Sequence, residues 1–156
     1  MSATQFEQAR CLCAIVLRHP ALLRDIEEAF AGLALPPSLA AIRDAVLDWA
    51  DAELESDLLL THLRASGLAA EALQVMSADP VPLPACASAD AMPAEAEAGW
   101  WHYFGLMHQD SLQDDLGAAS REFIARPNEA TQRRLLGLRS AQLALTEFGP
   151  EADADA

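Results

Sequence analysis

Two consecutive runs predict a helical hairpin: GWWHYFGLMHQDSLQDDLGAASREFIARP (residues 99–127) and NEATQRRLLGLRSAQLALTEF (residues 128–148). Apolar residues recur every three or four positions in each run, which places them on one side of a helix. Pro127 cannot continue a helix and disfavours helical geometry at Arg126, so the first, long helix ends there. Asn128 is a good N-cap for a second helix that folds back on the first. The predicted seams are Trp101, Phe104, Leu112, Leu116, Ala119 and Phe123, with His108 completing the spacing, and Thr131, Leu135, Leu138, Gln142 and Leu145.

The second helix carries more apolar side chains than a two-helix hairpin can enclose. Leu136 and Leu143 lie about a quarter turn from the seam, and Ala141 and Phe148 lie on its other flank. Part of this surface therefore needs another neighbour, either the rest of the chain or a different protein. Periodicity alone favours packing within the chain, because apolar stripes belong to a core more often than to an interface.

Composition predicts a helical protein of one ordinary domain, or of a small domain with an appendage, and we expect a cytoplasmic location by default. It has 156 residues, 52% of them hydrophobic, and its many Ala and Leu residues favour helices over strands. No run approaches the ~18–20 apolar residues that span a bilayer, and Met1–Arg10 lacks the order of a secretory signal. The net charge of −14 repels phosphate backbones and anionic lipid surfaces, so we expect neither direct nucleic-acid binding nor membrane binding.

The N-terminal half predicts about five short helices and no strand. Its breaks are prolines and glycines, such as Pro20, Pro36 and Gly67, and Ser56 is a candidate N-cap. An all-apolar run, residues 11–17, marks the first helix as the centre of a bundle. Four of the predicted helices span residues 6–18, 20–31, 57–66 and 69–77, and a third helix in chain order follows Pro36-Pro37. The expected inward side chains include Leu39, Ile42, Val46, Trp49, Leu59, Leu60, Leu63, Leu73 and Met76.

The chain is therefore predicted to be all-α, with a bundle joined to a hairpin. We expect a helical bundle at residues 1–78, a Pro/Ala-rich connecting loop at 79–98, the long helix and hairpin at 99–149, and a disordered acidic tail at 150–156. The aromatic group at the start of the long helix should hold that end on the bundle and leave the distal half projecting. This group is Trp100, Trp101, Tyr103 and Phe104.

Searches for catalytic chemistry find little in this sequence. It has no glycine-rich phosphate loop, no His-Glu-x-x-His pair and no Cys-x-x-Cys half-site for zinc. Cys11 and Cys13 point to nearly opposite sides of a helix, and the neighbouring side chains Asp114 and Asp115 also diverge. We expect reduced thiols, histidines in ordinary packing or surface roles, no metal, no cofactor and no catalysis by this chain alone.

Several ordered segments resemble one family, the C-terminal domain of bacterial DnaG-type primase. They are AIVLRHPALL (residues 14–23), LAAIRDAVL (39–47), LLTHLRASG (59–67), the Trp100-Trp101 entry to a long helix, and the closing hairpin. The resemblance covers about Glu7 to Phe148. Each segment alone is a weak indication of the family. Their order and spacing, together with the closing hairpin, make the combined resemblance more specific.

The resemblance implies a primosome interaction domain that docks on the N-terminal domains of the hexameric replicative DNA helicase and couples primer synthesis to unwinding. The zinc-binding module and metal-dependent polymerase core of a complete primase are not in these residues, so this would be a non-catalytic domain or a free-standing relative. The hairpin would be the main docking element, and the bundle could receive the tail of single-stranded-DNA-binding protein. The helicase contacts expected are Leu112, Leu116, Phe123, Leu136, Leu143 and Phe148, and the candidate contacts for the tail are Arg10, Arg18 and Arg24.

Three other interpretations stay open on the sequence. The helicase's own N-terminal domain has a related bundle, so the chain could belong to the other side of that interface. The seams could serve self-association in a helical regulatory protein. A bundle with a pocket lined by Trp49, Met76 and Trp101 could bind a small molecule.

Overall fold

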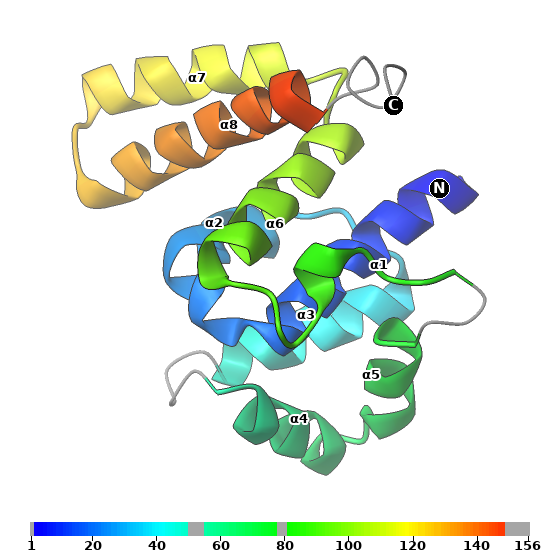
Figure 1. Ribbon diagram of the computed structural model, residues 1–156. Helices are drawn as coiled ribbons and strands as arrows, with labels where there is room; N and C mark the ends of the chain where they lie inside the picture. Colours follow the sequence, from blue (N-terminus) through cyan, green and yellow to red (C-terminus); the bar gives the residue numbers. More distant parts are fainter. Residues whose placement is uncertain (1, 50–54, 78–80, 149–156) are drawn as a thin grey trace.

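The computed structural model describes residues 2–49, 55–77 and 81–148, with residues 144–148 as backbone alone. This part of the chain contains helices and no strand, which confirms the all-α class (Figure 1). The helices are α1 (Ala3–Arg18), α2 (Leu23–Ala31), α3 (Pro37–Trp49), α4 (Ser56–Ala65), α5 (Ala69–Val75), α6 (Pro93–Met107), α7 (Leu112–Ala125) and α8 (Glu129–Phe148), with short 3-10 turns η1 (Pro20–Leu22) and η2 (Ala85–Ala87).

Helix α1 lies at the centre of the bundle, as its all-apolar run predicts. Every residue from Ala9 to Leu17 is buried, and α3, α4, α5, α6 and both 3-10 turns pack around it. The helix begins before the predicted Phe6 because Ser2 and Gln5 form a reciprocal capping box. It ends at His19-Pro20, where η1 leads directly into α2.

Two expectations for α4 and α5 are wrong. Ser56 is not an N-cap: it lies inside α4, and its hydroxyl donates 2.6 Å to the carbonyl of Leu17 on α1. Leu73 does not face inward, being 69% exposed, and Ala72 and Val75 are buried in its place. A seven-residue helix has few turns, so a small rotation about its axis decides which side chains meet the core.

The bundle is held to the segment before η2 by a buried arginine. The guanidinium of Arg10 donates 2.9 Å to the carbonyls of Val75 and Ser77 and 2.7 Å to that of Val81, and it forms a 3.0 Å ion pair with Glu7. This planar fork of donors satisfies carbonyls at the end of α5 and in the chain beyond it.

Helix α6 begins at Pro93, inside the predicted loop of residues 79–98, because proline is well suited to the first turn of a helix. Its aromatic group packs on the bundle as expected. Trp100 is fully buried, Trp101 and Phe104 are nearly so, and the three rings contact one another at centroid distances of 4.9–5.5 Å. These contacts fix α6 to the rest of the core.

The predicted long helix is interrupted at residues 108–111, between α6 and α7. His108 ends α6, its backbone N–H bonded to the carbonyls of Phe104 and Gly105, and its Nδ1 lies 2.8 Å from the Phe104 oxygen. Ser111 then starts α7 and contacts Asp115 with its hydroxyl at 3.1 Å. The chain changes direction here, so α7 does not continue the axis of α6 (Figure 1).

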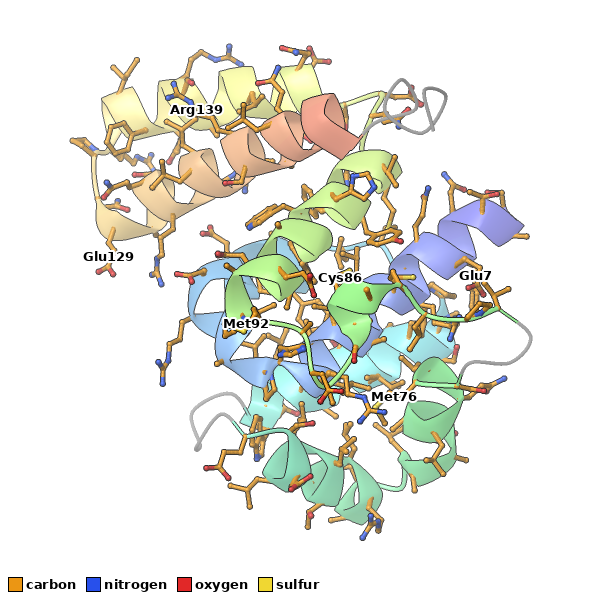
Figure 2. All side chains as sticks on the ribbon, in the orientation of Figure 1. Glu7, Met76, Cys86, Met92, Glu129 and Arg139 are labelled. Carbon is orange, nitrogen blue, oxygen red and sulfur yellow. The ribbon has the colours of Figure 1, made fainter. Side chains whose placement is uncertain are left out.

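Helices α7 and α8 lie side by side and antiparallel at one end of the molecule, as predicted (Figure 1). Helix α8 packs against α6 and α7 and also contacts α2. The hairpin is thus carried by α6 rather than projecting freely from it. Figure 2 shows the side chains of the hairpin, with Arg139 labelled on α8 and Glu129 labelled at the tip of the hairpin.

Candidate protein-binding surface

The joint of the hairpin is set by local hydrogen bonds. The side chain of Asn128 accepts from the N–H of Thr131 at 2.9 Å, while the Thr131 hydroxyl accepts from the N–H of Asn128 at 3.1 Å and donates to the carbonyl of Arg126 at 2.8 Å. This reciprocal cap starts α8 directly after Pro127. The predicted joint, a proline followed by an N-cap residue, is therefore confirmed.

Some of the predicted helicase contacts are covered by packing between the helices. Leu112 is 4% exposed, so it belongs to the core and offers nothing to a partner. Leu116 is half-buried and packs on the same core, and Phe123 is half-buried. Leu138 and Ala141 are buried on α8; Ala141 thus belongs to the interior and not to spare surface.

The other predicted contacts divide between exposed and undescribed side chains. Leu136 is 54% exposed and Leu143 is 63% exposed, both on α8. Phe148 lies at the end of α8, outside the described side chains. Ile124 on α7 is not among the predicted contacts, and it is 80% exposed. The sequence could have indicated this exposure, because Ile124 is a large apolar residue next to Phe123 that lies off the predicted seam.

Three exposed apolar side chains lie on the side of the hairpin that faces away from the bundle. Ile124 lies half a turn around α7 from Asp115, which lines a cleft next to the bundle. Arg134 of α8 lines the same cleft, and Leu143 lies half a turn around α8 from it, on the opposite side of the helix. Leu136 is seven residues before Leu143, which is about two helical turns, so it lies on the same side of α8 as Leu143.

Two arginines share that side of the hairpin. Arg139 lies between Leu136 and Leu143 in α8 and is exposed. Arg121 is exposed on α7, and its Nη1 lies 3.4 Å from the position that a Cβ on Gly117 would take. We call the surface formed by Ile124, Leu136, Leu143, Arg121 and Arg139 the outer face. Exposed leucines and isoleucine beside arginine are typical of a protein-binding surface.

The cleft on the opposite side of the hairpin has a volume of about 590 Å³ and lies between α2 and α8. One wall carries Asp25, Glu27 and Glu28, and the other carries Arg133 and Arg134. Arg133 donates 3.1 Å to the carbonyl of Arg24, so the walls are joined by a hydrogen bond to backbone. The burial of Glu97 nearby, with a smaller contribution from Asp25, raises the pKa of that carboxyl group.

The three arginines proposed for a protein tail do not form one site. Arg10 is buried and committed to its carbonyls, so it is excluded as a contact. Arg24 is exposed and lines the cleft between α2 and α8. Arg10 is not among the residues that line this cleft, so the two arginines lie at different places. Arg18 is half-buried in the last turn of α1.

The pocket proposed for a small molecule is also not assembled. Trp101 lines the cleft described above, but neither Trp49 nor Met76 does. A smaller pocket of about 200 Å³ between α1, α3 and α5 includes none of the three.

The nucleophilic and metal-ligating residues are dispersed. Burial raises the pKa of the Cys11 thiol to about 11 and that of Cys13 to about 12, and it also raises the pKa of Cys86. These thiols are protonated at neutral pH, and all three are free. Within the described residues, no group of three histidine, cysteine or acidic side chains is arranged to hold a metal ion.

Comparisons of the chain with known protein families, with curated proteins and with solved structures find no match. Among the described helices, none combines the length and the apolar character needed to cross a membrane.

Proposed function

We propose that the chain is a cytoplasmic, non-catalytic interaction domain of the primosome, which docks on the N-terminal domains of the replicative DNA helicase as the C-terminal domain of DnaG-type primase does. The order of the sequence segments that resemble this family supports the proposal. The arrangement of a helical bundle with a C-terminal hairpin is compatible with it.

The observation that carries the proposal is the exposure of Leu136 and Leu143. A hairpin that hid its leucines would offer a partner no apolar stripe along α8, whereas these two are more than half exposed and aligned seven residues apart. A partner helix laid along α8 would bury the exposed part of both, and that part of each leucine contributes roughly half of the ~1.5–3 kcal/mol gained by burying a whole leucine side chain. Docking by this surface therefore has a physical driving force.

The role is mechanical rather than chemical. A domain bound to the helicase raises the local concentration of an attached primase at the newly unwound strand, which needs no catalytic group here. The chain itself would contribute affinity and orientation. Its acidic surface, with a net charge of −14, would keep the domain from competing for the DNA.

The proposal is tested by size-exclusion chromatography of the purified chain with the replicative helicase of the same cell. We expect co-elution with the helicase hexamer. Elution of the chain by itself as a dimer, with no transfer to the helicase peak, would instead support self-association through the outer face. Elution as a free monomer at micromolar concentrations of both proteins would contradict helicase docking.

A further inference from the structure

The charge of the chain is unevenly distributed. The whole chain carries 24 acidic and 10 basic residues, yet the segment Leu116–Leu143 carries five of the arginines and only two acids, Glu122 and Glu129. This distal part of the hairpin is thus basic on a strongly acidic protein, although Asp114, Asp115 and Glu147 balance the five arginines over residues 112–148 as a whole. Such an asymmetry guides the approach of a partner of opposite charge and disfavours like-charged surfaces.

The arginines of the outer face have no ion-pair partner on the described part of the chain. The carboxylate of Glu122 is 3.6 Å from Arg126, whereas Arg121 and Arg139 form no such contact. Arg139 is the only charged residue between Leu136 and Leu143. A partner that covers these leucines must therefore bring something to meet Arg139, because a buried unpaired guanidinium is strongly destabilising.

From this we infer that the surface which receives the hairpin is an acidic helical one, with carboxylates placed beside apolar side chains so that they pair with Arg121 and Arg139. This inference rests on the proposed function, since it describes the surface that the helicase would present. It adds that specificity comes from charge, whereas Ile124, Leu136 and Leu143 supply most of the buried apolar area.

A single-stranded nucleic acid is the other acidic macromolecule that arginines bind. The outer face favours protein because aliphatic side chains accompany its arginines, and none of the hairpin's aromatic rings whose side chains the structure describes is exposed. Single-stranded DNA or RNA is bound mainly by aromatic rings that stack with the bases, together with cations along the backbone. The overall charge of −14 opposes a polyanion as well.

The test compares two charge reversals that change the net charge equally. Arg139→Glu lies on the outer face, and Arg64→Glu lies at an exposed position of α4 in the bundle. Both should fold like the natural chain by circular dichroism. We expect Arg139→Glu to weaken binding to the helicase about tenfold or more at low salt, and Arg64→Glu less than about twofold. The difference should shrink as salt screens the pair.

The outcomes separate the two claims. Helicase binding by the natural chain with equal affinities for the two variants would overturn the acidic-surface inference and leave the proposed function intact. Failure of the natural chain to bind helicase would overturn both. In a parallel fluorescence-anisotropy titration with a labelled single-stranded oligonucleotide, binding that Arg139→Glu abolishes would also overturn the inference, because the occupant would then be nucleic acid.

Discussion

The indole ring of Trp101 on α6 fills the space beside Gly137 on α8 where any side chain would stand. This contact brings the axis of α8 close to α6 and seats the hairpin on the aromatic group that is packed in the bundle. The missing side chain of Gly137 thus sets the distance between two parts of the molecule. The orientation of the outer face depends on it.

Replacing Gly137 by alanine is expected to destabilise the chain. Alanine favours a helix by up to about 1 kcal/mol, but its methyl group would overlap the Trp101 ring and force α8 away from α6. We expect a net loss of about 1–2 kcal/mol in the free energy of unfolding, measured by denaturant titration. The control is Gly117→Ala, whose methyl group would meet only the mobile end of Arg121 and should stabilise the chain. Equal effects of the two variants would refute the close packing of α6 on α8.

Arg10→Met is expected to lower the free energy of unfolding by about 3 kcal/mol. The substitution keeps an unbranched, apolar stem but removes the guanidinium, which leaves three carbonyl oxygens, at the end of α5 and in the segment beyond it, without their donor. Arg10→Lys should recover only part of the loss, because an ammonium group cannot reach all three in one plane. A thermal melt of either variant that matched the natural chain would show that this arginine is not a structural clamp.

Glu97→Gln is expected to raise the melting temperature at pH 7 and to leave it unchanged near pH 4. Burial and the nearby Asp25 raise the pKa of this carboxyl group in the folded chain, so folding disfavours its ionised form. The stability it contributes is present below the ordinary pKa and is lost as the pH rises through the raised value. Glutamine stays neutral throughout. Glu95→Gln in the first turn of α6, where the helix dipole favours an acid, should not raise the melting temperature at any pH.

Leu112→Ala and Leu136→Ala should differ in their effect on folding stability, because one of these predicted helicase contacts is buried and the other is exposed. Leu112 is buried, so its truncation should cost about 2–5 kcal/mol of folding stability. Leu136 is exposed, so the same change should stay within about 0.5 kcal/mol. Chemical denaturation measures both. Similar costs at the two positions would mean that α8 is rotated so that Leu136 is not exposed.

Helix positions were predictable from the sequence to the extent that local chemistry fixes them. Pro127 and Asn128 mark the joint of the hairpin, and the all-apolar run of α1 marks the centre of the bundle. The break between α6 and α7 was missed because no proline or glycine lies at residues 108–111. Its signal was Ser111 followed by two acids in the next turn, which is a helix start.

The candidate surface was predictable only in part, because periodicity shows which residues share a side and not what covers it. Leu112 shares its seam with Leu116 and Phe123, yet only tertiary packing shows that it is the most buried of the three. Leu136 and Leu143 were identified because they lie off the seam, and Ile124 meets the same criterion on α7. Arg10 was expected at a surface, and only the fold brings distant carbonyls to its guanidinium.

The most direct measurement is the affinity of the double variant Leu136→Ala/Leu143→Ala for the replicative helicase, by isothermal titration calorimetry beside the natural chain. Both positions are exposed, so the variant should fold normally and any loss reports on binding. We expect the free energy of binding to weaken by about 2 kcal/mol or more, roughly thirtyfold in Kd. A natural affinity in a correctly folded variant would contradict docking through α8.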